Sequence, residues 1–353
     1  MTEAFGGSGG IAQYNRDLLW ALSKSNSVSE VVVVPRLGSS GGDALPTKVR
    51  QLDASRARTT YVARSVSAAM QSWPFDAIFC GHLYHMPLAA LIGRTAQVPL
   101  WLQTHGVDAW RRPDPIIRYA AEHSQLITTV SRHTKRKLLA WANIEPERVR
   151  VLPNTVRPMF SPGPADQRFM EQLGLADQKV ILTVSRLSSA DFYKGHHRIF
   201  QILPSILKFH PDARYVIVGD GDARAELQQD VARRGLSSVV LFLGGRSDTD
   251  VLSLYRSSKV FAMPSTKEGF GIVFLEAAAT GLPVIGGNRD GSADALADGL
   301  IGRMIDPEDE DALTETLVSA LAGSAKADAN SVGRFAFENF ARHVDDLVQR
   351  LAC

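Results

Sequence analysis

The sequence has few cysteines and no long apolar run. Only Cys80 and Cys353 are present among 353 residues, so neither a disulfide framework nor a cysteine metal cluster is expected, and a reducing cytoplasm is the default location. No apolar run reaches the roughly 18–20 residues that cross a bilayer, and the first residues do not resemble a signal peptide. With 45% hydrophobic and 22% charged residues, the chain has the composition of a globular protein long enough for two domains.

The two halves of the chain differ in charge. Residues 1–160 contain 19 Lys and Arg and 11 Asp and Glu, a net charge of +8, whereas residues 161–353 contain 20 and 26, a net charge of −6. A basic half favours an anionic partner, such as a phosphate-bearing acceptor or an anionic membrane face; scattered, solvated charge is the equal alternative. No basic stripe interleaved with aromatics is present, so nucleic acid is not expected as a partner.

Both halves alternate short β-branched runs with helical patterns, which predicts an α/β fold with doubly wound parallel sheets. A Pro-rich stretch at residues 157–164 is interpreted as a linker between a first domain (residues 1–160) and a second domain (165–330). Residues 331–353 are predicted to form a last helix that packs back on the first domain. The predicted strands are residues 30–34, 76–80, 100–104, 126–130, 149–152, 179–184, 214–218, 239–243, 260–263, 283–285 and 303–305. The predicted buried face of the last helix contains Phe335, Phe337, Phe340 and Val344.

A glycine-rich loop, which includes Gly9 and Gly10, opens the first predicted helix at residues 11–23. Such a loop cradles phosphate when a strand precedes it, but here only five residues come before the first glycine, Gly6. Either that strand is nearly absent, or the sequence starts downstream of the natural start, and we favour the second interpretation.

Two glutamates, Glu268 and Glu276, lie eight residues apart around a strand–loop–helix junction. Glycines between them let the backbone approach a ligand, and the helix N-terminus favours a phosphate. Ionised carboxylates accept hydrogen bonds from sugar hydroxyls. The pattern therefore favours a ligand with both phosphate and hydroxyl groups, such as a nucleotide sugar, over an ordinary turn with a solvent-facing glutamate.

Further candidates follow other predicted strands. Arg186 and Lys194 follow residues 179–184, where their positive charge would suit a diphosphate, although a surface pair is the alternative. His105 follows residues 100–104, and Gly219 follows residues 214–218, both at the ligand-binding end of a parallel sheet. The two D-x-D patterns are Asp220 with Asp222 and Asp248 with Asp250. We interpret them as helix N-caps rather than metal ligands, and no metal site is predicted.

Taken together, these motifs resemble the glycosyltransferases of family 4, the retaining group with the GT-B architecture of two Rossmann-like domains facing a cleft. The resemblance covers nearly the whole chain. It is most specific at residues 184–187 (Val-Ser-Arg-Leu), 193–195 (Tyr-Lys-Gly), 218–221 (Val-Gly-Asp-Gly) and 268–277 (Glu-Gly-Phe-Gly-Ile-Val-Phe-Leu-Glu-Ala). One departure is Asp290, which stands where many relatives carry Glu.

The resemblance implies a role for each site residue. Glu276 would hold the donor ribose, and Glu268 would contact hydroxyls of the transferred sugar. Arg186 and Lys194 would hold the diphosphate, and His105 would help to position the reacting sugar. Backbone contacts to phosphate or sugar are implied for Gly9, Gly10, Gly219, Phe270, Gly271 and Ile272.

The implied reaction is metal-independent transfer of a hexosyl group, with retention, to a hydroxyl of a glycan or polyprenyl-diphosphate-linked acceptor of surface-polysaccharide type. GDP-mannose is the favoured donor, ahead of UDP-hexoses, and no further cofactor is implied. The basic first half suits peripheral attachment at the inner face of the cell membrane. Two alternatives stay open: a sugar-nucleotide epimerase on the same fold, and a nucleotide-sugar-binding protein with a defective site.

Overall fold

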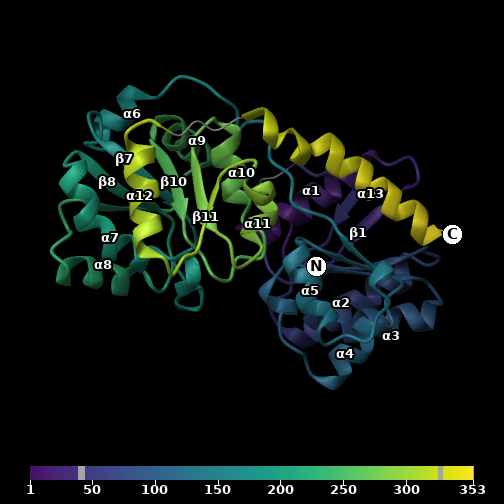
Figure 1. Ribbon diagram of the computed structural model, residues 1–353. Helices are drawn as coiled ribbons and strands as arrows, with labels where there is room; N and C mark the ends of the chain where they lie inside the picture. Colours follow the sequence, from purple (N-terminus) through teal and green to yellow (C-terminus); the bar gives the residue numbers. More distant parts are fainter. Residues whose placement is uncertain (39–43, 325–328, 353) are drawn as a thin grey trace. The chain divides into compact units, whose positions relative to one another are not determined.

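The computed structural model describes residues 1–38, 44–324 and 329–352, so Cys353 lies outside the described residues. The chain forms two compact units, each with its own parallel sheet (Figure 1). The first unit comprises Met1–Thr155 and Phe337–Cys353, and the second unit comprises Val156–Ala336. In the described part of the chain, no helix combines the length and apolar character needed to span a membrane.

The second unit is built on a six-stranded parallel sheet with the order β12-β11-β10-β7-β8-β9. Its central strands are apolar runs buried along most of their length, as expected of a parallel sheet with helices on both faces. The strands are β7 (Lys179–Val184), β8 (Ala213–Val218), β9 (Val240–Gly244), β10 (Val260–Met263), β11 (Val284–Gly287) and β12 (Arg303–Ile305).

Among the described residues of this unit, seven α-helices surround the sheet. On one side α7 and α12 pack together, and their apolar faces join the sheet in the main core of the unit. The helices are α6 (Gln167–Gln172), α7 (His196–Phe209), α8 (Arg224–Arg233), α9 (Asp248–Ser257), α10 (Ile272–Ala279), α11 (Ser292–Ala295) and α12 (Glu310–Leu321), with 3-10 turns η4 (Ser189–Lys194), η5 (Ala297–Gly299) and η6 (Ala329–Phe335).

The prediction that the D-x-D aspartates are N-caps is wrong. The N-cap of α9 is Ser247, whose hydroxyl accepts a hydrogen bond from the Asp250 N–H at 3.1 Å. The N-cap of α8 is Ala223, and Asp222 instead accepts two bonds from Ser189, at 2.9 Å from its N–H and 2.6 Å from its hydroxyl. Asp222 therefore ties the η4 turn to the loop between β8 and α8.

The first unit contains a four-stranded parallel sheet with the order β3-β4-β5-β6 and a separate parallel pair, β1-β2. The sequence prediction missed β2, where only Val49 of the three residues is apolar. The elements are α1 (Gly10–Lys24), β1 (Val31–Val33), β2 (Val49–Gln51), α2 (Arg58–Gln71), β3 (Ile78–Cys80), α3 (Met86–Ala96), β4 (Leu100–Thr104), α4 (Pro115–Glu122), β5 (Leu126–Thr129), α5 (Arg132–Leu139) and β6 (Val149–Val151), with 3-10 turns η1 (Leu83–His85), η2 (Val107–Ala109) and η3 (Pro146–Arg148).

The last helix, α13 (Phe337–Ala352), packs on α1 in the first unit. It starts later than the predicted residue 331, because Ala329–Phe335 forms the 3-10 turn η6. Two of the four predicted face residues are buried on α13: Val344, and Phe340, whose ring meets Tyr14 edge-on at 5.8 Å. The Lys24 ammonium instead lies over the Phe337 ring, 4.6 Å from the ring centre. Phe335 belongs to the second unit.

A backbone contact between the ends of β7 and β8 makes glycine necessary at position 219. Gly219 has a φ of +133°, and a Cβ there would lie 1.8 Å from the Ser185 carbonyl oxygen. We expect Gly219→Ala to lower the free energy of unfolding by about 3 kcal/mol, measured by urea denaturation.

The matched control is Gly174→Ala, at a φ of +70° with no atom within 4 Å of the new Cβ. It carries the left-handed strain without the collision, so a loss of only about 1 kcal/mol is expected. Equal losses in the two variants would contradict the assigned role of the β7–β8 contact.

Candidate functional site

The strand order of the second unit reverses between β7 and β10. From β7 the chain proceeds outward through β8 and β9, and then returns to place β10 on the other side of β7. Open α/β sheets bind ligands beyond the carboxyl ends of the strands at such a reversal. The loops that leave these two strands carry three of the predicted site residues, namely Arg186 and Lys194 after β7 and Glu268 after β10.

Lys194 and Glu268 form an ion pair, with Lys194 Nζ donating to Glu268 Oε2. Each side chain is only 14% exposed, which limits screening of the pair by solvent. The structure thus joins two residues that were selected separately from the sequence. Their contact places a cation and a carboxylate side by side at the strand-order reversal.

Asp290, just beyond β11, anchors the loop that carries Glu268. Its Oδ2 accepts hydrogen bonds from the Glu268 N–H at 2.6 Å and the Ser265 hydroxyl at 2.8 Å, and its Oδ1 accepts from the Ser292 N–H at 2.9 Å. Burial raises the pKa of Asp290 to about 6, against the hydrogen bonds that favour the ionised carboxylate. Close packing adds to this anchor, because a Cβ on Gly291 would lie 2.0 Å from the Gly269 carbonyl oxygen.

Glu276 lies on α10 with its carboxylate engaged by two partners. Arg157 Nη2 donates to its Oε1 at 3.2 Å, and the Tyr255 hydroxyl donates to its Oε2 at 3.3 Å. Arg157 also pairs with Asp248, so one guanidinium connects two carboxylates. Burial raises the pKa of Glu276 to about 7, although Arg157 acts in the opposite direction.

The N-terminus of α10 lies next to Glu268 in the chain. Its N-cap is Gly271, at φ 86°, and no side chain caps the helix, whose first residue is Ile272. The preceding Phe270 is buried and meets the Phe335 ring at 5.7 Å, which fixes the backbone leading into the helix. An uncapped helix start of this kind suits an anion.

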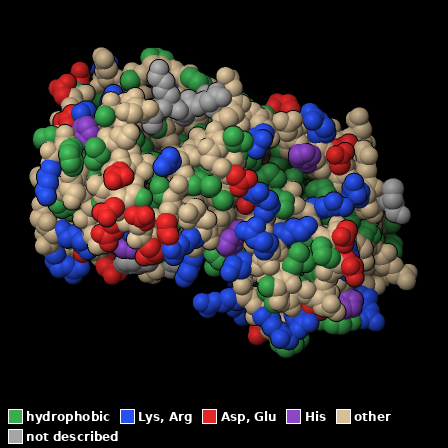
Figure 2. Space-filling view, viewed as in Figure 1, with side chains coloured by type: hydrophobic (Ala, Val, Ile, Leu, Met, Phe, Trp, Pro, Cys, Tyr) green, Lys and Arg blue, Asp and Glu red, His purple; other side chains and the backbone are tan. Residues whose placement is uncertain are grey.

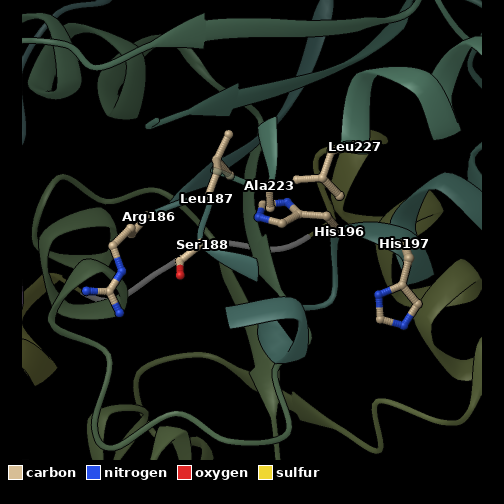
Figure 3. Close-up of a pocket in the computed structure, with 7 residues that line it drawn as sticks. All are labelled: Arg186, Leu187, Ser188, His196, His197, Ala223 and Leu227. Atoms are coloured by element: carbon tan, nitrogen blue, oxygen red, sulfur yellow. The ribbon is translucent and has the colours of Figure 1, made fainter. Parts of the chain in front are cut away.

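Arg186 has an exposed side chain, and in Figure 3 its guanidinium extends away from His196. His196 belongs to the core: its ring nitrogens lie 3.0 Å from the Ser185 hydroxyl and 2.9 Å from that of Tyr215, and burial lowers its pKa to about 3. The small cavity in Figure 3 has a volume of about 10 Å³, room for about one water, so it is too small for a sugar. Its lining residues are Arg186, Leu187, Ser188, His196, His197, Ala223 and Leu227.

In the first unit, His105 lies beyond β4, where the sequence predicts it. One of its ring nitrogens lies 3.1 Å from the Gly81 carbonyl oxygen, and its ring meets Tyr14 of α1 edge-on at 5.1 Å. Its backbone N–H donates to Asp108 at 3.1 Å. Burial lowers the pKa of His105 to about 3, so at neutral pH the imidazole is uncharged.

Gly9 and Gly10 form the start of α1, one turn before Tyr14. Gly9 is the N-cap at φ 84°, and no side chain caps the helix. A Cβ at either glycine would meet no atom within 4 Å in the first unit. Gly9 and Gly10 open α1, and His105 contacts Tyr14 of the same helix. The predicted glycines and His105 are therefore linked by α1 within the first unit.

Sequence reasoning missed Arg157 and Tyr255 as partners of Glu276, and it gave Asp290 no role. Arg157 was assigned to the Pro-rich linker, and its pairing depends on a fold-back of that segment that no local pattern predicts. Asp290 offered a signal, because a lone carboxyl between glycines after a buried strand is typical of a loop anchor.

Two family models match the chain. Residues 166–334 match Glycosyl transferases group 1, and residues 8–159 match Glycosyltransferase Family 4.

Curated relatives cover different shares of the chain. The GDP-mannose-dependent alpha-(1-6)-phosphatidylinositol monomannoside mannosyltransferase of Mycolicibacterium smegmatis is 30% identical over 69% of this chain and 66% of its own length. The D-inositol 3-phosphate glycosyltransferase of Corynebacterium kroppenstedtii is 29% identical over 67% and 57%. The chain thus spans about three fifths of the length of these relatives. The Mycobacterium tuberculosis mannosyltransferase of the same name as the first is 26% identical over 90% of this chain and 87% of its own.

Solved structures share the fold. Anabaena Alr3699/HepE, crystallised with UDP, has a TM-score of 0.77 at 21% identity, covering 99% of this chain and 100% of that one. WaaG, a glycosyltransferase of lipopolysaccharide biosynthesis, has a TM-score of 0.68 at 21% identity, covering 100% and 97%. The expected α/β architecture of two domains is thereby confirmed as GT-B.

The raised pKa of Glu276 predicts a pH dependence of stability. In the folded protein this carboxyl holds its proton up to about pH 7, whereas the unfolded chain releases it near 4.5. Between these values the folded state binds more protons, so its stability falls as pH rises. We expect Glu276→Gln, which stays neutral, to remove this component of the slope between pH 4.5 and 7, measured by urea denaturation.

Glu171→Gln is the control, because Glu171 is exposed on α6. This control should keep the wild-type slope. An unchanged slope in Glu276→Gln would show that Glu276 titrates at its ordinary pKa.

Proposed function

Because the chain belongs to the family 4 glycosyltransferases of the GT-B fold, we propose that it transfers a hexosyl group from a nucleoside diphosphate sugar to a hydroxyl group of an acceptor. The observation that carries this proposal is the Lys194–Glu268 pair at the strand-order reversal, beside the uncapped start of α10. This group of residues offers a cation and backbone N–H groups for phosphate and a carboxylate for sugar hydroxyls.

In the proposed donor complex, Lys194 Nζ binds the diphosphate, and the side chain of Arg186 adds a second positive charge. Bond cleavage develops negative charge on the departing diphosphate, and fixed cations stabilise that charge without rearranging during the step. Once Lys194 turns to the diphosphate, Glu268 is released to accept hydrogen bonds from the hexosyl hydroxyls. Glu276 accepts hydrogen bonds from the ribose hydroxyls, and Arg157 holds its carboxylate in place.

The relatives guide the choice of substrates. A mannosyltransferase from Mycolicibacterium smegmatis is named as GDP-mannose-dependent, whereas the Anabaena structure holds UDP. We therefore propose GDP-mannose as the first donor to test and UDP-hexoses as the second. A phosphatidylinositol mannoside and an inositol phosphate appear in the relatives' names, which supports a phosphate-bearing, lipid-linked glycan as acceptor.

We also propose that the reaction retains the anomeric configuration, needs no metal and uses no cofactor beyond its donor. Support for metal independence comes from three of the four D-x-D carboxylates, which have partners within the protein: Asp222 accepts from Ser189, Asp220 pairs with Arg224, and Asp248 pairs with Arg157. His105 is proposed to position the reacting sugar as a neutral hydrogen-bonding group. The anomer of the product, measured by NMR, and activity in the presence of EDTA test these points.

The first test is a thermal-shift panel of GDP, UDP, ADP and dTDP and their sugars, with EDTA present. A ligand that binds only the folded state stabilises it by about 2.7 kcal/mol at 100 times its Kd. We expect one nucleotide family to raise the Tm clearly, and its sugar then to be transferred to a lipid-linked acceptor. Turnover of donor without acceptor would instead indicate an epimerase, and binding without any turnover a defective site.

Variants locate the donor site within the second unit. Glu276→Ala removes the proposed ribose acceptor, so we expect at least about tenfold weaker nucleotide binding, since hydrogen bonds to charged groups contribute roughly 1.5–3 kcal/mol. Glu276→Ala also removes one of the two carboxylates that pair with Arg157. The ligand-induced rise in Tm of each variant is therefore measured from the Tm of the same variant without ligand. Glu226→Ala on the exposed face of α8 is the control and should bind like wild type. Equal affinity in both variants would contradict the assignment.

We further propose that the protein is cytoplasmic and attaches peripherally to anionic membranes. Figure 2 shows Lys and Arg side chains gathered on the visible face of the first unit, in agreement with the positive charge of the first half of the sequence. We expect cosedimentation with phosphatidylglycerol-containing vesicles that weakens as salt rises, and no binding to phosphatidylcholine alone. Salt-independent binding, or none, would contradict this attachment.

A further inference from the structure

A chain of hydrogen bonds runs from β10 to the end of β7 in the second unit. Its members, in order, are the Ala262 carbonyl oxygen, the Thr183 hydroxyl, the Tyr215 hydroxyl, the His196 ring and the Ser185 hydroxyl. The Thr183 and Tyr215 oxygens are 2.9 Å apart. His196 Nδ1 lies 2.9 Å from the Tyr215 oxygen, and its Nε2 lies 3.0 Å from Ser185 Oγ. The three middle members are buried, so solvent does not compete for their bonds.

The carbonyl oxygen at one end fixes the direction of every bond in this chain. A carbonyl oxygen only accepts, so Thr183 donates its hydroxyl proton to Ala262 and accepts from Tyr215. The single Tyr215 proton is used in that bond, so the Tyr215 oxygen accepts from His196 Nδ1. His196 Nε2 is then the acceptor, and the Ser185 hydroxyl donates to it. The network therefore assigns His196 one neutral tautomer, with the proton on Nδ1.

The surroundings of His196 keep its ring neutral. Burial lowers its pKa to about 3, and the nearby charges of Lys194 and His197 act in the same direction. An imidazole with so low a pKa is a weak base at neutral pH, so it does not activate the Ser185 hydroxyl as a nucleophile. The bond between Nε2 and Ser185 is therefore suited to holding the serine in place.

The Ser185–His196 bond closes the base of the loop that carries two proposed diphosphate ligands. Ser185 immediately precedes Arg186, and a single residue, Gly195, separates His196 from Lys194. Figure 3 shows the His196 ring directed toward the segment that begins at Arg186. Because the bond joins the two ends of this loop, it limits how far apart the backbones of the two cationic residues can move.

Other contacts tie the same loop to its surroundings. The Leu187 N–H donates to the Asp220 carbonyl oxygen at 2.9 Å, and the Thr266 N–H donates to the Tyr193 carbonyl oxygen at 3.1 Å. These bonds attach the loop to the segments that follow β8 and β10. They do not join the two ends of the loop to each other, which the bond from Ser185 does.

We propose that His196 is a positioning residue for the diphosphate of the donor: fixed in the Nδ1–H tautomer by Tyr215, it holds Ser185 and so sets the spacing of Arg186 and Lys194. The ring itself does not contact the ligand. The identity of that ligand rests on the proposed function, whereas the tautomer and the closure of the loop are properties of the chain without ligand.

Nitrogen NMR of the imidazole tests the tautomer without any ligand. In the 15N-labelled full chain, His196, assigned by comparison with His196→Gln, should show a protonated Nδ1 and an unprotonated Nε2 between about pH 5 and pH 8. Tyr215→Phe removes the acceptor of the Nδ1 proton and keeps the ring, so the proton should then move at least partly to Nε2. A proton on Nε2 in the wild type, or a charged ring within this pH range, would overturn the proposal.

Two substitutions separate the two bonds of the ring. A glutamine amide reaches the position of Nε2 and can accept from Ser185, whereas the shorter asparagine amide reaches the position of Nδ1 and bonds to Tyr215 alone. We expect His196→Asn to bind inorganic pyrophosphate, GDP and UDP at least about tenfold more weakly than wild type, and His196→Gln to bind within about twofold. Ser185→Ala, which deletes only a hydroxyl, should behave like His196→Asn and replaces it if that variant does not fold.

Amide hydrogen exchange gives a measurement of loop closure that needs no ligand. The Leu187 N–H should exchange at least about tenfold faster in Ser185→Ala and His196→Asn than in wild type, because opening the base of the loop frees its first residues. In His196→Gln its exchange should stay close to that of wild type. Equal exchange in all four proteins would show that the Ser185–His196 bond does not hold the loop.

The binding results separate this proposal from the proposed function. If Ser185→Ala and His196→Asn bind as tightly as wild type, the positioning role is wrong, although the donor site stands. Equal weakening in the glutamine and asparagine variants would likewise overturn it, because glutamine keeps the bond from Ser185. If the wild type binds none of the three ligands, the proposed function is contradicted, and the tautomer and the Leu187 exchange alone decide whether His196 holds the loop.

Discussion

The reversal of strand order between β7 and β10 is the constraint on which the candidate donor site depends. All strands of the second sheet are parallel, so their carboxyl ends share one edge, and the loops after β7 and β10 leave that edge as neighbours. Lys194 and Glu268 are 74 residues apart in the sequence, yet this topology alone brings them into contact. The charges of the site are thus supplied by two short loops, and their proximity is set by the sheet.

Sequence patterns predicted the strands of both units better than the contacts between side chains. The bounds of β4 in the first unit and of β7, β10 and β12 in the second unit agree with the predicted strands residue for residue. The pairing of Arg157 with Glu276 was beyond such reasoning, since a Pro-rich segment gives no indication of where its course returns. The N-cap predictions failed for two reasons: the Asp222 carboxylate is engaged by Ser189 of the η4 turn, and Ser247, just before Asp248, caps α9 instead.

The two units place their proposed ligand groups on similar supports. In each, a glycine at positive φ opens a helix without a side-chain cap, Gly9 for α1 and Gly271 for α10. In each, an aromatic residue within the first turns or just before the helix is held by another ring, Tyr14 by Phe340 and Phe270 by Phe335. The role of each glutamate and histidine remains a prediction, but the backbone that would present them is fixed by packing.

The position of Asp290 separates the shape of the Glu268 loop from its chemistry. The loop is held by hydrogen bonds to its backbone and to Ser265, and none of these bonds uses the Glu268 side chain. A substitution at the ligand-facing positions would therefore leave the anchor intact. In evolutionary terms, a loop built in this way can change its ligand by small steps, because the atoms that hold its backbone differ from those of the side chain that would contact a ligand.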